Sequence, residues 1–259
     1  MTTDDEQQFL RQGYLIAPVE QRQTLDRLRT DVLGLIEEFA QAKIGDLTRL
    51  HEFVSRERVN EIRVRIYNAL NDRPSFLDDY YAMAQSCIER IVGNELAAQQ
   101  RVNLSILMPQ DDGSQLKLHS DTMSGQSEYE AVLWIPLTDV HDTNSVYVMD
   151  FDVTREMFAQ LPAYHAKGMD ALYEDYKRQA TFIEMQYGQF LLFTPTLFHG
   201  SVVNQTATTR VSLNVRFKGL FTPYYAGDET EKKLGSFYRP FRVRPTTQIA
   251  LRHKEPIFG

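Results

Sequence analysis

The period of the hydrophobic pattern changes near residue 101, and this change constrains the fold more than any other feature of the sequence. Before it, apolar residues recur at helical spacing, as over residues 20–42, 59–70 and 77–98. After it, β-branched and aromatic residues alternate with polar ones in short segments separated by turn residues. We therefore predict a mainly β fold with a helical N-terminal part.

Eight short strands are expected after the change of period, with little helix between them. They cover residues 101–108, 115–121, 131–137, 145–151, 180–186, 189–195, 197–203 and 210–217. A further strand is expected at 13–19 and a helical excursion at 154–179. This pattern predicts helices packed on an antiparallel sandwich or barrel. Because no linker divides the chain, we expect one domain, with a helical buttress at 1–100, a β core at 101–220 and a tail at 221–259.

The composition argues against several classes of protein. The chain has 35 Asp and Glu against 28 Lys and Arg, a net charge of −7, and an acidic surface repels nucleic-acid phosphates. No apolar run reaches membrane-spanning length, and the first residues lack a signal-peptide core. The lone cysteine, Cys87, cannot form an internal disulfide, which agrees with a reducing compartment. We expect a cytoplasmic protein whose partner is a small molecule.

A histidine and an aspartate stand two positions apart in the segment "LKLHSDTMS". On a strand, His119 and Asp121 would point the same way, and Gln115 and Lys117 would share their face. One imidazole and one carboxylate supply two of the three ligands of a facial metal triad. Alone, the pair is weak evidence, because a surface or capping role at a strand end is the more common one, so a second histidine is needed to favour a metal.

His199 is the best candidate for that second histidine, because apolar and small residues surround it in "FLLFTPTLFHGSVV". The strand that follows, "RVSLNVRF", places four polar residues on one face, namely Arg210, Ser212, Asn214 and Arg216. This polar face would lie in water on an ordinary amphipathic strand. Inside a barrel it would instead point to a charged ligand, since a buried arginine needs a partner such as a carboxylate.

The order of these motifs resembles that of the Fe(II)- and 2-oxoglutarate-dependent oxygenases, in particular the phytanoyl-CoA hydroxylase-like branch. The resemblance rests on His119-x-Asp121, on His199, and on Arg210 with Ser212 eleven positions after that histidine. "FLRQGYLIAP" and "AVLWIPLTDV" are also similar to segments of that branch, whereas the turn "DTNSVYVM" departs from its usual pattern.

The resemblance implies a double-stranded β-helix, a jelly-roll or cupin-like barrel buttressed by α-helices. It implies Fe(II) on His119, Asp121 and His199, with 2-oxoglutarate and O2 as cosubstrates. The distal carboxylate of 2-oxoglutarate would bind Arg210 and Ser212, and its other end would contact Asn103. A carboxylate at position 121 favours oxygenation, since the halogenating members have a small residue there.

The substrate side of the site is less constrained by the resemblance. Four residues share a face with the motif residues and are expected to reach a substrate, namely Lys117, Gln115, Asn214 and Arg216. The expected reaction oxidises a small metabolite, most simply by hydroxylation, with 2-oxoglutarate converted to succinate and CO2. A narrower resemblance, to oxygenases of bacterial carbohydrate and aminoglycoside gene clusters, suggests a biosynthetic sugar or natural-product intermediate.

Two other functions remain open at this stage. One is a cupin-like sugar epimerase or isomerase with His119 as its base, and the other is a barrel that binds a ligand without catalysis. The basic tail, which contains Arg239, Arg242 and Arg244, could act as a lid, bind an anionic substrate or make the contact of a homodimer.

Overall fold

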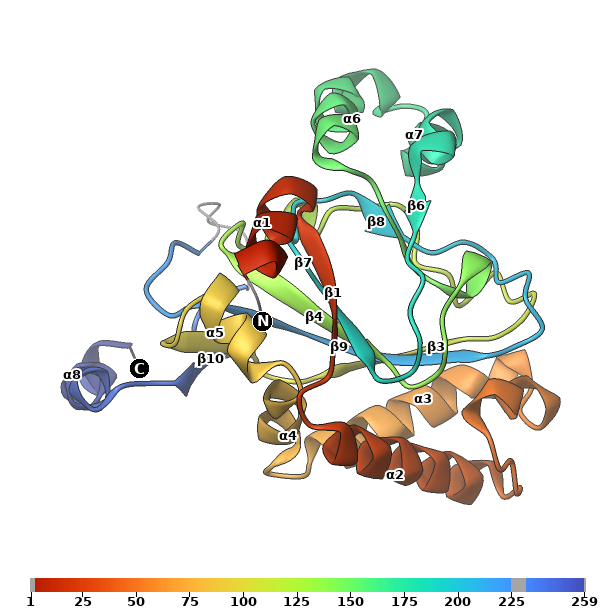
Figure 1. Cartoon of the computed structure of the whole chain (residues 1–259), viewed down its shortest axis with the longest axis horizontal. Helices are drawn as coiled ribbons and strands as arrows, with labels where there is room; N and C mark the ends of the chain where they lie inside the picture. Colours follow the sequence, from red (N-terminus) through yellow and green to blue (C-terminus); the bar gives the residue numbers. More distant parts are fainter. Residues whose placement is uncertain (1–2, 225–231, 259) are drawn as a thin grey trace.

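The computed structural model describes residues 3–224 and 232–258, with side chains described from 5 to 224 and from 232 to 252. The N-terminal part contains β1 (Tyr14–Pro18) and most of the helices, as the sequence predicted. These helices are α1 (Thr3–Gln12), α2 (Arg22–Ala40), α3 (Arg56–Asn71), α4 (Phe76–Ala82) and α5 (Gln85–Ile91). Figure 1 shows α2, α3 and α4 together along one side of the β-sheet.

The larger sheet has seven strands in the order β1-β7-β4-β9-β2-β10, with β3 also paired to β9. Neighbouring strands in it are antiparallel. Its remaining members are β2 (Leu96–Gln99), β3 (Asn103–Leu107), β4 (Glu130–Pro136), β7 (Gln189–Phe193), β9 (Arg210–Gly219) and β10 (Tyr238–Arg242). The ten residues of β9 pair along one edge first with β3 and then with β2, so this strand organises the sheet.

The alternation along β9 sorts its side chains between two environments. Val211, Leu213, Val215 and Phe217 are fully buried in the hydrophobic core that the sheet forms with the N-terminal helices. The intervening residues point to the other face of the sheet, where polar groups gather. The polar face of this strand is therefore turned into the molecule, as a ligand-binding lumen requires, and is not the solvent face of an ordinary amphipathic strand.

A second, three-stranded sheet in the order β6-β5-β8 faces the polar side of the larger one. Its strands are short, namely β5 (Tyr147–Val148), β6 (Thr181–Phe182) and β8 (His199–Gly200). The helical excursion forms α6 (Phe151–Tyr164) and α7 (Met169–Tyr176), which project above this sheet in Figure 1. The predicted β-helix fold with helical buttresses is confirmed, but the sheet is not closed into a barrel.

The segment at 115–121 is not a strand, and this prediction was wrong. Its only ladder contact is the bridge between His119 and His199, after which the chain enters the short 3-10 helix η2 (Asp121–Ser124). The expected strands at 145–151, 180–186 and 197–203 shrink to two-residue ladders. Gly125, with φ of 81°, ends η2, and such turns interrupt the pairing that alternation alone would predict.

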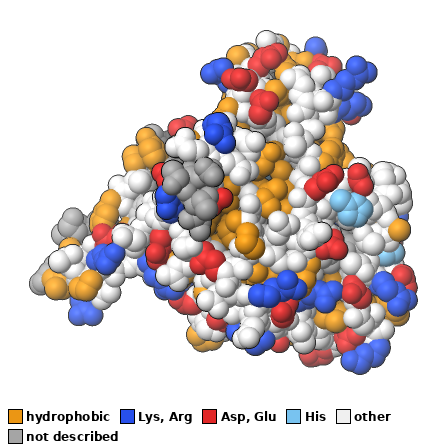
Figure 2. Space-filling view, in the orientation of Figure 1, with side chains coloured by type: hydrophobic (Ala, Val, Ile, Leu, Met, Phe, Trp, Pro, Cys, Tyr) orange, Lys and Arg blue, Asp and Glu red, His pale blue; other side chains and the backbone are white. Residues whose placement is uncertain are grey.

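The tail adds the edge strand β10 and the helix α8 (Pro245–Phe258) to the fold, and its stretch 225–231 lies outside the described residues. Arg242 pairs with Asp78 of α4 at 2.7 Å and stacks over Tyr81, so it is held against the helices. No helix in the described part of the chain is long and apolar enough to cross a membrane. On the face drawn in Figure 2, acidic and basic side chains are interspersed rather than gathered by sign.

Candidate functional site

The two motif histidines are neighbours because their backbones pair. His119 N donates to His199 O at 3.0 Å, and His199 N donates to His119 O at 2.8 Å. The pairing joins the irregular segment before η2 to β8, and it places the two imidazole rings 4.3 Å apart. His199, which is eighty positions from His119 in the sequence (199 − 119), is thus brought beside the His-x-Asp motif.

Both imidazoles are oriented by the same kind of contact. Nδ1 of His119 lies 2.9 Å from Lys117 O, and Nδ1 of His199 lies 2.9 Å from Leu197 O. A carbonyl oxygen only accepts, so each Nδ1 carries the proton and each Nε2 presents a lone pair. Burial and the neighbouring His119 ring lower the pKa of His199 to about 4, which keeps that imidazole neutral at physiological pH.

Asp121 completes a group whose three ligand atoms all lie within 4.8 Å of one another. One carboxylate oxygen of Asp121 lies 3.5 Å from His119 Nε2, and the backbone N–H of Asp121 donates to Pro195 O at 3.0 Å. Two imidazole nitrogens and one carboxylate this close together match the facial triad of non-haem iron sites. Within the described residues this is the one such His, Cys, Asp or Glu group found.

Arg216 pairs with the other carboxylate oxygen of Asp121. Its Nη2 and Nε donate to Asp121 Oδ2 at 2.7 and 3.0 Å, and its Nη1 donates to Gln99 at 3.1 Å. Burial is the strongest single influence on Asp121 and raises its pKa, but the Arg216 charge together with the contacts to His119 and His199 outweighs burial and holds the pKa well below its usual range. The carboxylate is therefore charged and fixed in direction, with Oδ1 left toward the histidines.

A second buried acid lies behind Arg216. Glu130 Oε1 is 3.5 Å from Arg216 Nε, and Glu130 Oε2 accepts a hydrogen bond from the hydroxyl of Tyr238 on β10. Burial raises the pKa of Glu130 to about 7, although the Arg216 charge opposes the shift. The C-terminal strand thus reaches the metal-site carboxylate through Tyr238, Glu130 and Arg216.

Arg210 lies on the same face of β9 and has a different environment. It is 3 % exposed, and its Nη2 donates to Ser105 Oγ at 3.3 Å. Its Nε and Nη1, and the hydroxyl of Ser212 beside it, have no hydrogen-bond partner within the described residues. Burial lowers the pKa of Arg210 to about 10, so the guanidinium keeps its charge without a carboxylate to neutralise it.

A small cavity of about 80 Å³ joins Arg210 to the two histidines. Apolar side chains from β4, β5 and β7 make its other walls, among them Trp134, Val148, Leu191 and Phe193. The Trp134 ring lies 5.6 Å from the guanidinium carbon of Arg210. A charged group in an apolar chamber has a strong preference for an anionic ligand, because water and protein dipoles are both scarce there.

The small cavity is contiguous with a larger hollow of about 510 Å³, since both are lined by His119, Ser105, Leu116, Asn214 and Arg216. Asn103 and Gln115 line the larger hollow and not the small cavity. Asn103 Nδ2 donates to Asn214 Oδ1 at 3.0 Å across the β3–β9 pair. Asn103 therefore stands outside the chamber that Arg210 shares with the histidines.

Lys117 lies away from the two histidines, in a hollow that it shares with Gln115. Its ammonium pairs with Asp170 of α7 at 2.5 Å, in this hollow of about 430 Å³. The expectation that it shares the face of His119 assumed a strand at 115–121, which does not form. Alternation does not hold in irregular backbone, so residue 117 can point away from residue 119.

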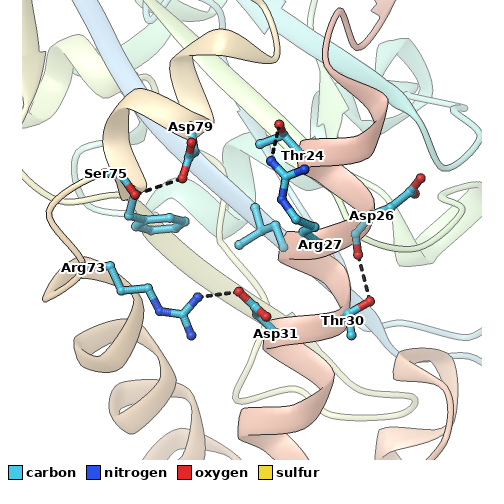
Figure 3. Close-up of a pocket in the computed structure, with 10 residues that line it drawn as sticks. Thr24, Asp26, Arg27, Thr30, Asp31, Arg73, Ser75 and Asp79 are labelled. Atoms are coloured by element: carbon cyan, nitrogen blue, oxygen red, sulfur yellow. Dashed lines mark hydrogen bonds and ion pairs between the residues drawn. The ribbon is translucent and has the colours of Figure 1, made fainter.

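Another hollow, of about 550 Å³, lies between α2 and α4 (Figure 3). Its polar side chains are paired with one another, as Arg73 with Asp31 at 2.5 Å and Ser75 with Asp79 at 3.1 Å. None of the motif residues lines it. We therefore do not assign it to the chemistry.

Sequence reasoning missed three contributors to the site. Ser105 sits opposite Ser212 in the β3–β9 register, and Glu130 and Tyr238 support Arg216 from two other strands. The alternation of Asn103 and Ser105 in "RVNLSILM" was a usable signal for the first. Nothing local marks Glu130 or Tyr238, because their role depends on which strands become neighbours.

Several solved structures are similar in fold to this chain. HygX from Streptomyces hygroscopicus with iron bound matches at 14% identity and a TM-score of 0.57, covering 93% of this chain and 97% of its own. EctD from S. alaskensis matches at 16% identity and a TM-score of 0.56, and the match covers 94% of this chain and 87% of EctD. The non-heme alpha ketoglutarate dependent carbocyclase SnoK from nogalamycin biosynthesis matches at 12% identity and a TM-score of 0.52, and the match covers 94% of each chain.

A comparison with curated protein sequences gives no match. The family described as phytanoyl-CoA dioxygenase (PhyH) does match, over residues 9–212. That range runs from α1 through the His-x-Asp motif and His199 to Arg210 and Ser212, so it contains the motif residues gathered at this site. The chain belongs to the phytanoyl-CoA dioxygenase family and is an Fe(II)- and 2-oxoglutarate-dependent oxygenase.

Proposed function

We propose that His119, Asp121 and His199 hold the Fe(II) of this oxygenase. The donor set fits, because two imidazoles held through Nδ1, with Nε2 turned to the site, and one ionised carboxylate leave the remaining coordination positions for cosubstrates. Arg216 keeps the Asp121 carboxylate charged and fixed, which is the task of a residue behind a metal ligand.

The single observation that carries the assignment of the cosubstrate is the unpaired guanidinium of Arg210. A fully buried cation with two unsatisfied nitrogens is costly unless a ligand completes it. The distal carboxylate of 2-oxoglutarate is a fitting partner, with the free Ser212 hydroxyl as a further donor. Ser105 would hold the guanidinium in place from the neighbouring strand.

Iron with 2-oxoglutarate supplies the oxidising power for the reaction, with succinate and CO2 as co-products. The protein's own residues bind and orient the reactants and keep water away. Trp134, Leu191 and Phe193 form the apolar wall that excludes water around the cosubstrate. Gln115 and Asn214, which line the larger hollow, are placed to contact a substrate there. We propose hydroxylation of a small metabolite, such as a sugar or natural-product intermediate, by one domain spanning residues 1–259.

The proposal is tested by following succinate released from 2-oxoglutarate in air, with Fe(II) added, in the presence of a panel of small metabolites. His119→Ala, Asp121→Ala and His199→Ala should each abolish release and weaken metal binding measured by calorimetry. A variant that releases succinate like the wild type would remove that residue from the assignment. A metal-free epimerase with His119 as base would retain activity in a chelator, and it gives no role to the free Arg210.

A further inference from the structure

The larger hollow is the way to the triad from outside, because it shares His119 with the small cavity and opens to the surface. Its walls come from β3, from the loop at 109–116 and from α3. A substrate that approaches the exposed edge of His119 therefore touches α3. The inference below deepens the proposed function and rests on it for identifying the occupant as substrate.

One face of α3 presents two arginines and an amide to this hollow. Arg56, Asn60 and Arg63 stand four and three positions apart, a spacing that puts them on the same side of a helix. Arg63 is half-buried and its guanidinium is held in place. Its Nε and Nη2 donate to Asn60 Oδ1 at 3.2 and 2.8 Å, and its Nη1 donates to Leu104 O at 3.4 Å.

Neither arginine forms an ion pair in the described part of the chain, although the charge of Arg56 acts on the neighbouring carboxylate of Glu57. Arg56 donates to the carbonyl of Pro109 at 3.5 Å, and Arg63 bonds only an amide and a carbonyl. Other arginines of this acidic chain do find acids, as Arg65 of the same helix does with Glu61 at 3.8 Å. The charge of Arg56 and Arg63 is therefore left for something that enters the hollow.

The other charged groups of the hollow do not cancel these two positive charges, because Arg216 is compensated by an acid and Asp111 contributes a single negative charge. Arg216 is paired with Asp121 at 2.7 Å. Asp111 is buried, and its two oxygens accept from Gly113 N and from the Ser114 hydroxyl, so it faces inward to its own loop. The hollow thus carries a net positive charge, in a protein whose formal charge is −7.

The rest of the polar lining consists of amides and hydroxyls, namely Asn60, Asn103, Ser105, Ser114, Gln115 and Asn214. Such a lining suits a substrate rich in hydroxyl or amide groups. We propose that the substrate is a polar molecule bearing an oxyanion, a carboxylate or a phosphate, which binds Arg63 with Arg56 at the rim. This fixes the far end of the substrate while its reacting carbon lies beside the triad.

The arginine side chains report such binding directly. With [15N]arginine in the protein, the Nε–H signal of Arg63 is identified by its loss in Arg63→Gln, and that of Arg56 by its loss in Arg56→Gln. Protein loaded with Ni(II) and 2-oxoglutarate, so that Arg210 is occupied, is titrated at low salt with inorganic phosphate and, separately, with acetate. We expect a saturable shift of the Arg63 signal with at least one of the two anions, and the stronger one identifies the class.

Arg65→Gln is the matched control, since it removes an arginine of the same helix that does not line the hollow. The double variant Arg56→Gln/Arg63→Gln should lower the affinity for the anion by roughly tenfold or more, whereas Arg65→Gln should leave that affinity unchanged. Unsaturable shifts, or equal shifts at Arg65 and Arg63, would overturn the inference. The titration repeated on metal-free Arg210→Gln needs no working iron site, so a failure there counts against the oxyanion subsite and not against the proposed oxygenase function.

Discussion

Arg210 and Arg216 stand six positions apart on the same face of β9, and both are buried, yet only one of them has an acid to pair with. Arg216 binds Asp121 at 2.7 Å and approaches Glu130, while Arg210 keeps two nitrogens unpaired within the described structure. The difference shows that the two buried arginines have different roles in this protein. One arginine fixes the carboxylate of Asp121, which we propose as a metal ligand, and the other has no acid and is proposed to bind 2-oxoglutarate.

The comparison also shows what the sequence could and could not predict. The alternation in "RVSLNVRF" correctly turned four polar residues inward, but it could not distinguish the arginine beside Asp121 from the one beside Ser105. That distinction depends on strands β4 and β3 and on η2, which are distant in sequence. Arg216 was expected to contact substrate; it does line both hollows, and its guanidinium is bonded to Asp121 and Gln99.

The fold itself followed the hydrophobic period closely where pairing is long, and poorly where it is short. Long elements such as α2, α3 and β9 were predicted because their buried faces repeat over many residues. Residues 115–121 have the alternation of a strand and lack a partner along most of their length, so they stay irregular. Tyr238 and β10 were missed because an edge strand in a polar tail has little hydrophobic pattern of its own.

The largest effect is expected from removing the paired arginine. Arg216→Met leaves Asp121 and Glu130 as buried acids without a counter-charge, so the free energy of unfolding of the metal-free protein should fall by about 3–5 kcal/mol. Urea unfolding measures this, with the exposed pair at Arg155 as the control through Arg155→Met. A loss under about 1 kcal/mol would mean that the pair contributes no more than a surface one.

The unpaired arginine should give the opposite pattern. Arg210→Met should leave the stability of the metal-free protein unchanged or raised, because it removes an unsatisfied buried charge. The same variant should bind 2-oxoglutarate more weakly by about 2 kcal/mol or more. Urea unfolding and calorimetric titration check the two halves, and a variant that is destabilised while its 2-oxoglutarate affinity is kept would reverse the roles given to the two arginines.

The acid behind Arg216 should make stability depend on pH. Because the folded pKa of Glu130 is raised from 4.5 to about 7, the folded state holds the proton more tightly than the unfolded chain. The contribution of Glu130 to stability is therefore fully present when the pH is below the pKa of the unfolded chain. It is lost as the pH rises through the pKa of the folded state. The loss should be about 3 kcal/mol, because each pKa unit between 4.5 and about 7 corresponds to about 1.4 kcal/mol.

Unfolding of wild type and Glu130→Gln across this pH window isolates that contribution. The variant should lack the slope that the wild type shows, and exposed Glu128→Gln should retain it. Identical pH profiles for wild type and Glu130→Gln would indicate that Arg216 keeps Glu130 ionised throughout. The arginine would then be shared equally by its two acids.

The smallest effect is expected at an ion pair remote from the site. Arg73 and Asp31 border the hollow of Figure 3, and Arg73 Nη1 lies 2.5 Å from Asp31 Oδ2. Their side chains are 42% and 46% exposed. Exposed pairs contribute little, so Arg73→Ala should lower the free energy of unfolding by no more than about 1 kcal/mol and leave 2-oxoglutarate binding unchanged. Urea unfolding and calorimetry again supply the readouts, and a loss of cosubstrate affinity here would link this hollow to the site.

The account rests most directly on the claim that the triad and Arg210 together bind iron and 2-oxoglutarate. Anaerobic addition of both to the metal-free protein should produce the visible charge-transfer band of 2-oxoglutarate chelated to Fe(II). The band should be absent in His199→Ala at any 2-oxoglutarate concentration, and in Arg210→Met it should appear only at much higher concentrations. A wild-type protein without the band, or variants that develop it at wild-type concentrations, would contradict the account.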